Sequence, residues 1–274
     1  MDLVKDCQYQ HLPFCRSELD HAYGSNIHIL SNPVLMTLLA KVCAKGTTQP
    51  EANQIFTELY IDLLKAVLNA EFPRKLATMP SRMIDQTERG YYSGEILDPD
   101  VQVAVAAVAR AGILPSQIVF DRLNLLFNPN GIRLDCFFVS RSTDTSQRVI
   151  GANVASSKIG GSLNDRIVLL PDPMGATGSS LLQTLDTYRE AGAGEGQKSV
   201  AMHLIVTPEY IKHIQTNYPS LVVYAIRLDR GLSSPDVLAT KPGLLWSEER
   251  GLNDHSYIVP GGGGIGEVMT NSWV

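Results

Sequence analysis

The sequence has few cysteines, and none of them stands in an arrangement in which cysteine usually does chemistry. Among 274 residues there are 4 cysteines: Cys7, Cys15, Cys43 and Cys136. None forms a Cys-x-x-Cys pair, and none lies near a histidine at the spacing of metal ligands. This pattern excludes a disulfide-rich or zinc-finger scaffold. It favours unpaired thiols in a reducing compartment, so we expect a cytoplasmic protein.

Long apolar runs and an excess of positive charge are also missing. No stretch approaches ~20 apolar residues, so we expect no membrane span, and the start MDLVKDCQYQH has no apolar segment typical of a signal peptide. Lys and Arg number 23 against 28 Asp and Glu, which gives a net charge of −5. Because a nucleic-acid backbone demands clustered cations, we expect no nucleic-acid partner.

Several catalytic motifs are absent as well. The 6 histidines show no His-Glu-x-x-His spacing, no Gly-x-Ser-x-Gly elbow occurs, and no GxxxxGK[ST] loop is present. A zinc hydrolase, an α/β-hydrolase and a Walker-type ATPase are therefore disfavoured. His203 lies in an apolar strand pattern and is expected to be a core residue, whereas His213 is expected on a solvated helix face.

The first part of the chain predicts helices. We expect residues 1–25 to form an N-terminal extension and 26–274 to form a single domain. A helix is predicted over 31–46, capped by Ser31 or Asn32, and a second helix follows a capping-box pattern at Thr48 and Glu51. The apolar stripe over 55–68 is either core or an oligomer contact. Residues 71–100, rich in proline and charge, predict an arm or hairpin.

From residue 101 compact apolar runs alternate with helical patterns. The runs are 101–109, 134–139, 166–170, 199–206 and 221–226, and helical patterns occupy 179–192 and 208–219. Apolar runs of this length suit strands buried on both faces, and strand–helix alternation indicates a parallel sheet. The predicted fold class is therefore α/β, with a mostly parallel sheet flanked by helices and an N-terminal helical portion.

One loop in this region carries the chemistry. Residues 166–180 read RIVLLPDPMGATGSS, an apolar run followed by an acid and a stretch of small residues. The loop precedes a helix expected from about Ser179, whose first amides lack partners within the helix and favour an anion. An acid, Asp172, beside a phosphate cradle suits a ligand with hydroxyls as well as phosphate, such as a sugar phosphate.

These residues carry a family resemblance. DPMGATGSS resembles the DPMxATGGS loop of uracil phosphoribosyltransferases, with Ser179 where that family usually has glycine. YIVPG (257–261) resembles the family's uracil-binding stretch, ARAG (109–112) resembles its LRAG, and FVSRSTDTSQRV (138–149) resembles its YRDEETLEPV segment. Together these matches span about residues 26–272 and imply a type I phosphoribosyltransferase fold.

The resemblance implies transfer of phosphoribose from phosphoribosyl pyrophosphate (PRPP) to uracil, which gives UMP and pyrophosphate, with Mg²⁺ as cofactor and a homodimer or larger homo-oligomer. Asp172, toward the ribose hydroxyls, and Arg110, toward the pyrophosphate, are the implied catalytic residues. The implied PRPP-binding residues are Arg110, Arg141, Asp172, Pro173, Met174, Ala176, Thr177, Gly178, Ser179 and Ser180. The implied uracil-binding residues are Tyr257, Ile258, Gly263 and Gly264. No protein ligand to the metal is assigned, and residues 142–165 form either a lid or a plain hairpin.

The tail departs from the family pattern. Where the family usually reads PGxGDxGDR, this chain reads PGGGGIGEV, so Gly264, Glu267 and Val268 replace two aspartates and an arginine. Three readings stay open: a working uracil enzyme, an enzyme for another base, or a weak enzyme that binds ligand or partners. A shifted acid, Glu267 or Asp254, is one way to replace the missing aspartate, and a Gly264→Asp exchange is expected to raise activity with uracil.

Overall fold

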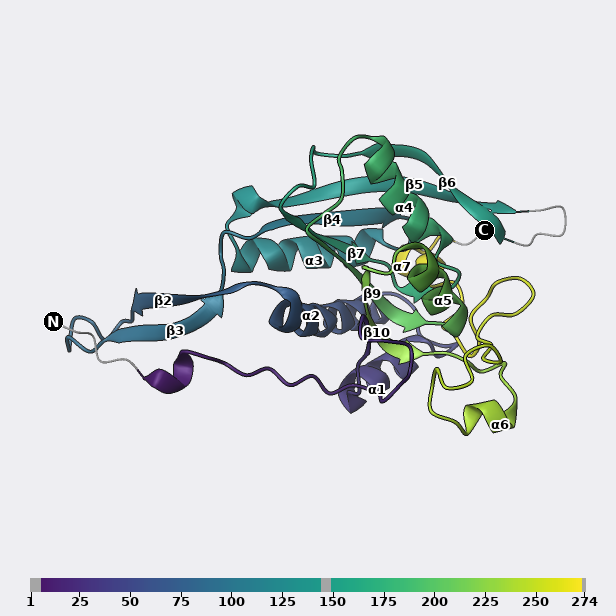
Figure 1. The fold of residues 1–274 in the computed structure, drawn as a ribbon, viewed down its shortest axis with the longest axis horizontal. Helices are drawn as coiled ribbons and strands as arrows, with labels where there is room; N and C mark the ends of the chain where they lie inside the picture. Colours follow the sequence, from purple (N-terminus) through teal and green to yellow (C-terminus); the bar gives the residue numbers. More distant parts are fainter. Residues whose placement is uncertain (1–5, 144–148, 273–274) are drawn as a thin grey trace.

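The computed structural model describes residues 6–143 and 149–272, with the backbone alone for 141–143 and 149–152. At its centre lies a twisted sheet of eight strands (Figure 1). In spatial order the path is β1 (Ile27–Ile29), β10 (Val222–Leu228), β9 (Lys198–Val206), β7 (Arg166–Pro171), β4 (Gln102–Ala109), β5 (Ile132–Thr143) and β6 (Val149–Lys158), and β8 (Met174–Gly175) pairs with β9. All neighbours are parallel except β5 and β6. The predicted mostly parallel sheet is confirmed.

Helices cover both faces of the sheet and enclose two cores. One face carries α1 (Pro33–Val42), α2 (Glu51–Glu71) and α3 (Ile113–Leu126), and the other carries α4 (Ser179–Glu190) and α5 (Pro208–Asn217). Strand β4 shows how the sequence divides them, since successive side chains point to opposite faces. Val103 and Val105 join the α2 core, whereas Ala104 and Ala106 join the α4–α5 core.

The apolar stripe over 55–68 is core. Phe56, Leu59, Tyr60 and Leu63 on α2 are all 0% exposed. Its reading as an oligomer contact is therefore wrong. The stripe stabilises the sheet instead, at roughly 1.5–3 kcal/mol for each large apolar side chain buried.

The two N-terminal helices begin differently from one another. Asn32 caps α1 as predicted, because its Oδ1 accepts hydrogen bonds from the amides of Val34 and Leu35. The capping box predicted at Thr48 and Glu51 is wrong. Helix α2 begins at Glu51 after Pro50, with no side-chain hydrogen bond at its cap.

Residues 71–100, predicted to form an arm or a hairpin, contain a hairpin. Strands β2 (Arg74–Pro80) and β3 (Tyr91–Leu97) pair in antiparallel register and project from the body of the domain (Figure 1). The N-terminal segment, which includes the 3₁₀ turn η1 (Cys7–Tyr9), lies against this hairpin. There the Leu12 amide donates to Glu95 Oε2 at 3.0 Å.

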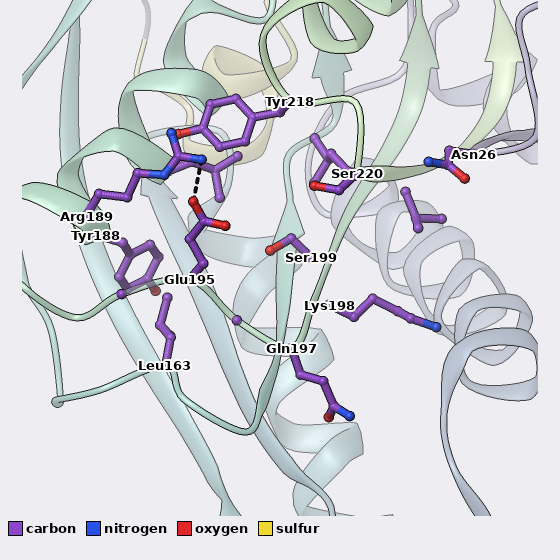
Figure 2. Close-up of a pocket in the computed structure, with 15 residues that line it drawn as sticks. Asn26, Leu163, Tyr188, Arg189, Glu195, Gln197, Lys198, Ser199, Tyr218 and Ser220 are labelled. Atoms are coloured by element: carbon purple, nitrogen blue, oxygen red, sulfur yellow. Dashed lines mark ion pairs between the residues drawn. The ribbon is translucent and has the colours of Figure 1, made fainter.

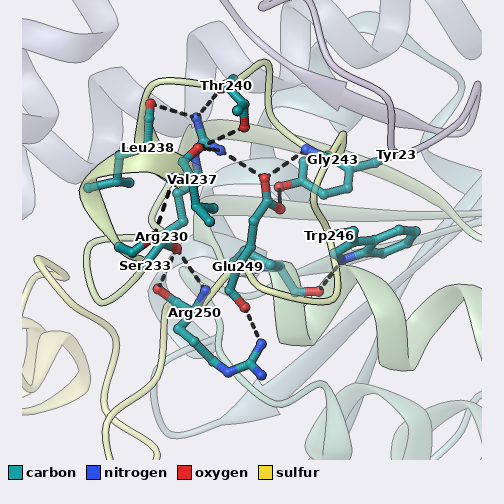
Figure 3. Close-up of polar contacts among 12 residues, drawn as sticks. Tyr23, Arg230, Ser233, Val237, Leu238, Thr240, Gly243, Trp246, Glu249 and Arg250 are labelled. Carbon is teal, nitrogen blue, oxygen red and sulfur yellow. Dashed lines mark hydrogen bonds and ion pairs between the residues drawn. The ribbon is translucent and has the colours of Figure 1, made fainter.

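A buried ion pair fixes the segment that leads to the tail. Glu249 is 1% exposed, and its Oε1 lies 2.8 Å from Arg230 Nη1 and accepts the Gly243 amide at 2.8 Å (Figure 3). The Tyr23 hydroxyl donates to the other oxygen of the same carboxylate. Burial, followed by the bond to Glu249, raises the pKa of this phenol, so it remains a donor at neutral pH. The segment before Ile27–Ile29 and the segment over 230–250 are thus tied together through one carboxylate.

The remaining elements are short. They are α6 (Pro235–Leu238), α7 (Ile265–Thr270) and the 3₁₀ turn η2 (Pro129–Gly131). Within residues 6–143 and 149–272, none of the helices combines the length and the apolar character that a bilayer crossing requires.

Candidate active site

The loop over 171–178 leaves the sheet at the carboxyl end of β7 and leads into α4. In open α/β sheets the ligand crevice lies beyond these ends. Two glycines give the loop its shape. Gly178, the N-cap of α4, has φ +84°, a left-handed conformation that favours glycine. At Gly175 a side chain would lie 2.9 Å from Val206 Cγ1, so β8 packs against β9 only without one.

The end of this loop presents backbone donors. Among the described residues, the amides of Thr177 and Gly178 have no hydrogen-bond acceptor. The first amides of α4 add further donors, since they have no partner within the helix. The sequence prediction of an anion cradle over 176–180 is consistent with this geometry.

Asp172 lies at the start of the same loop. Its side chain is half-buried, and its Oδ1 accepts the amide of Met174 at 3.0 Å. This bond closes a tight turn around Pro173, so the carboxylate is fixed relative to the loop backbone.

Arg110 follows β4, the strand next to β7, and therefore reaches the same edge of the sheet. Gly112 allows the two loops to approach closely, because a side chain there would lie 3.0 Å from the Pro171 carbonyl oxygen. The peptide between Ala109 and Arg110 is cis. The guanidinium does not stand alone: Nη2 lies 2.9 Å from Glu267 Oε1, and Nη1 donates to Ser272 Oγ at 2.9 Å.

The tail is held at the carboxyl end of β10, where Arg227 and Asp229 contact Gly261. A buried pair anchors it, in which Asp229 is 2% exposed and lies 2.6 Å from Arg227 Nε. Asp229 Oδ2 accepts the Gly261 amide at 2.7 Å, and Arg227 Nη2 donates to the Gly261 carbonyl at 2.9 Å. Burial disfavours the charged guanidinium, but the bond to Asp229 outweighs it and raises the pKa of Arg227.

The predicted uracil-binding residues lie along this anchored tail. Tyr257 is 58% exposed, and Ile258 is buried at 8%. Gly263 has φ +71° and open space where a side chain would stand. Gly264 is the N-cap of α7, and a side chain there would begin 2.4 Å from Glu267 Oε2. The Glu267 carboxylate thus occupies the space beside Gly264.

The structure brings most of the predicted site residues together at one edge of the sheet. The β4–α3 loop, the β7–α4 loop and the tail meet there, and a side chain at Gly266 would lie 3.3 Å from Ala111 Cβ. Arg141 is described by its backbone alone, in β5 opposite Ala152. Part of the segment considered as a lid, residues 144–148, lies outside the described residues.

Sequence reasoning missed residues that support the loop from behind. His213, predicted to lie on a solvated helix face, is only partly exposed, and its Nδ1 lies 2.7 Å from the Thr177 carbonyl oxygen, a contact that the sequence did not indicate. Thr207 Oγ1 donates to the Ala176 carbonyl at 2.7 Å. His203 is a buried core residue as predicted, and it also contacts the Asp172 carbonyl at 2.6 Å. The one available signal was Thr207, a polar residue directly after an apolar strand and before a helix that begins with proline.

A separate cavity of about 200 Å³ lies at the opposite end of the strands (Figure 2). Its lining includes Lys198 and Val222, the first residues of β9 and β10, and an ion pair of 2.6 Å between Arg189 and Glu195. It shares no residue with the β7–α4 loop. We therefore place the candidate site at the carboxyl edge.

No cluster of three or more His, Cys, Asp or Glu side chains suited to a metal ion is found in the described part of the chain. Mg²⁺ is commonly held by one or two carboxylates together with substrate phosphates. The residues present fit a metal ion of that kind, which arrives with an anionic ligand, and they do not form an all-protein metal cage.

Comparison with known proteins places these features in context. The family model described as uracil phosphoribosyltransferase matches residues 29–244. The solved structure of the AQ2163 protein from Aquifex aeolicus is similar at 20% identity and TM-score 0.68, over 90% of this chain and 99% of that one.

Two further solved structures are more distant. An adenine phosphoribosyltransferase from Trypanosoma brucei, in complex with AMP, pyrophosphate and ribose-5-phosphate, matches at 12% identity and TM-score 0.45, over 77% of this chain and 87% of that one. The adenine phosphoribosyltransferase from Leishmania tarentolae matches at 14% identity and TM-score 0.43, over 75% and 92%. Of the three structures, the Aquifex protein is the one whose similarity supports the fold described above.

Proposed function

The chain belongs to the uracil phosphoribosyltransferase family, and from this premise we propose that it transfers the 5-phosphoribosyl group of PRPP to uracil. In this reaction N1 of uracil loses its proton and forms a bond to C1′ of the ribose, and the bond from C1′ to the pyrophosphate oxygen breaks. The products are UMP and pyrophosphate. Positive charge develops on the ribose at the transition state, so catalysis depends on positioning and electrostatics.

The observation that supports this proposal most directly is the cradle at the carboxyl edge of the sheet. The amides of Thr177 and Gly178, which have no acceptor in the described part of the chain, suit the 5′-phosphate together with the first amides of α4. Asp172 stands at the other end of the same loop, where a carboxylate accepts hydrogen bonds from ribose hydroxyls. One loop thus offers donors for a phosphate and an acceptor for a sugar.

Arg110 and the tail complete the assignment. A guanidinium offers forked donors to pyrophosphate, and we assign this role to Arg110, with Arg141 as the second candidate. We assign the uracil edge to Tyr257, Ile258, Gly263 and Gly264. Mg²⁺, when bound, neutralises charge on the pyrophosphate; Asp172 is the carboxylate of this loop that would hold it.

A second candidate function is binding of PRPP without efficient transfer. The pairing of Arg110 with Glu267 favours it, because pyrophosphate must displace a carboxylate before it reaches the guanidinium. Both functions use the same cradle, and they differ in turnover.

Calorimetric titration with PRPP and Mg²⁺, then with uracil, tests both functions when UMP is followed in the same sample. PRPP binding with UMP formed supports the uracil enzyme. PRPP binding without UMP, from uracil at saturation, supports the binding function or another base, which a panel of bases then identifies by pyrophosphate release. No PRPP binding would overturn both.

We also propose that the protein forms a homodimer or a larger homo-oligomer. Large apolar side chains are exposed on the projecting hairpin and the turn that joins its strands, where Leu76 is 64%, Met79 45% and Met83 55% exposed. Sedimentation of the wild type and of Leu76→Ser with Met83→Ser tests this assignment. A monomeric wild type would overturn it.

A further inference from the structure

Two carbonyl groups at the end of the β7–α4 loop point into the protein. Thr207 Oγ1 donates to the carbonyl of Ala176 at 2.7 Å, and Nδ1 of His213 lies 2.7 Å from the carbonyl oxygen of Thr177. Because a carbonyl oxygen only accepts, His213 must carry its proton on Nδ1. Both partners come from one unit, the N-cap and second turn of α5.

The planarity of the peptide bond converts these contacts into a statement about donors. In a trans peptide the C=O of one residue and the N–H of the next point in opposite directions. If the Ala176 carbonyl points inward, the Thr177 amide points outward. If the Thr177 carbonyl points inward, the Gly178 amide points outward. Neither of these two amides has an acceptor among the described residues.

The Thr207 side chain is held in one orientation by burial and by a second hydrogen bond besides its contact with the loop. Its side chain is 0% exposed, and Oγ1 also accepts the Tyr210 amide at 3.0 Å as the N-cap of α5. One hydroxyl therefore both donates and accepts, and its direction is determined by two backbone groups. His213 is held in turn by its place on α5, and Gly178 packs against that helix near Tyr210 and Ile214.

We propose that Thr207 and His213 are positioning residues that aim the amides of Thr177 and Gly178 at the phosphate of the ligand. The inference rests on the proposed function, since it takes the ligand of this loop to be a phosphorylated ribose. Neither side chain touches the ligand; each acts through a peptide plane. α5 thus sets the donor geometry of a loop that belongs to a different strand–helix unit.

Matched variants separate the proposed contact from the volume of the side chain. Thr207→Val removes the hydroxyl and keeps the shape, whereas Thr207→Ser keeps the hydroxyl. His213→Leu removes the donor, whereas His213→Asn keeps a nitrogen donor two bonds from Cβ, where Nδ1 stands. His213 lies on a partly exposed helix face, so its variants test the proposal even where Thr207→Val fails to fold.

The readout is affinity for two probes measured by calorimetry, ribose 5-phosphate and pyrophosphate. We expect Thr207→Val and His213→Leu each to weaken ribose 5-phosphate binding about tenfold, because each frees one donor peptide to rotate. Thr207→Ser and His213→Asn should bind it within about twofold of the wild type. Pyrophosphate affinity, which depends on Arg110, should be the same in all five proteins.

Two results would overturn the proposal while the proposed function stands. One is that Thr207→Val and His213→Leu bind ribose 5-phosphate as tightly as a wild type that itself binds it. The other is an equal loss for ribose 5-phosphate and pyrophosphate, which would indicate general disruption of the site. A wild type that binds neither probe nor PRPP would instead remove the proposed function, and the inference with it.

Discussion

Arg110 and Glu267 form an ion pair in which Nη2 and Oε1 lie 2.9 Å apart, although 157 positions separate the two residues in the chain. The arginine side chain is 38% exposed and the glutamate side chain 26%. Ser272 adds a second contact to the same guanidinium. The tail therefore covers the arginine that we assign to pyrophosphate, and a ligand must compete with it.

Glu267→Gln should strengthen pyrophosphate binding by about two- to fivefold. The pair is partly exposed, and such pairs contribute about 0.2–1 kcal/mol, so the gain is modest. Isothermal titration with pyrophosphate and Mg²⁺ measures it. Glu58→Gln, the same change on the exposed face of α2, is the control and should leave the affinity unchanged; a weaker complex in Glu267→Gln would contradict the competition.

Gly264→Asp alone should not raise turnover with uracil, contrary to the expectation from sequence. A side chain at this position begins 2.4 Å from Glu267 Oε2, so the new carboxylate meets an existing one. The flexible end of Glu267 must move, at a cost from like charge. Gly264→Asp combined with Glu267→Ala should exceed Glu267→Ala about tenfold in kcat/KM for uracil. Gly264→Ala controls for bulk, and a gain in Gly264→Asp alone would show that Glu267 yields freely.

Asp172→Asn should weaken PRPP binding or slow transfer at least tenfold, which corresponds to about 1.4 kcal/mol. The amide keeps an oxygen for the Met174 amide, so the turn around Pro173 survives the exchange. Steady-state kinetics and calorimetry with PRPP check this prediction. Asp62→Asn, on the surface of α2, should behave as wild type, and an unchanged Asp172→Asn would remove this residue from the site.

Tyr60→Phe should stabilise the protein by about 1 kcal/mol. The Tyr60 hydroxyl is fully buried and has no hydrogen-bond partner within residues 6–143 and 149–272. A buried unsatisfied polar group costs roughly 1–3 kcal/mol. Removal of the hydroxyl leaves the ring in the core. Urea unfolding at neutral pH measures the difference, with Tyr188→Phe as the opposite case, since that hydroxyl donates to Asp135 at 2.9 Å. A destabilised Tyr60→Phe would reveal a partner for the hydroxyl.

Acidification from pH 6.5 to about 4 should destabilise the folded protein through His203. Burial lowers the pKa of His203 from 6.5 to about 4, although the bond to the Asp172 carbonyl opposes the shift. In this window the unfolded chain binds a proton that the folded protein excludes, so the free energy of unfolding falls as the pH falls. The full shift corresponds to on the order of 3 kcal/mol. The ring also faces the Tyr210 hydroxyl at 2.6 Å.

Urea titrations at several pH values, compared between the wild type and His203→Asn, isolate this contribution. His21 and His28 also have lowered pKa values, and they act equally in both proteins. The variant should lose part of the acid slope between pH 6.5 and 4. Parallel slopes in the two proteins would show that His203 does not titrate with folding.

The strands that form the middle of the sheet could be predicted because they are continuous apolar runs. Helix α3 could not, since Pro115 stands in its first turn and its apolar residues form no clear stripe. Strand β1 has three residues, which are too few to show an alternating hydrophobic pattern. The polar edge strand β6 forms because it pairs with β5. The local hydrophobic pattern of the sequence therefore predicted the central strands. It did not predict the elements whose formation depends on contacts with distant parts of the chain.

The candidate site divides in the same way. The β7–α4 loop is a continuous string of residues, so its geometry could be anticipated from glycine placement and the helix that follows. The contact of His213 with Thr177 joins residues 36 apart, and that of Arg110 with Glu267 joins residues 157 apart. Helical periodicity placed His213 on a polar face and carried no information on which loop would lie over it.

The pairing of β1 with β10 has a consequence for how the chain folds. Ile27 lies beside Val223, so along the described sheet path the first strand pairs only with β10, the last strand of that path to be synthesised. During synthesis, β1 stays unpaired until β10 has left the ribosome, and the parts of β9 and β10 on which α1 and α2 pack are made late as well. Long sequence separation between partners slows folding and prolongs the life of incomplete states. The sheet can therefore close at this edge only after Leu228 has been synthesised.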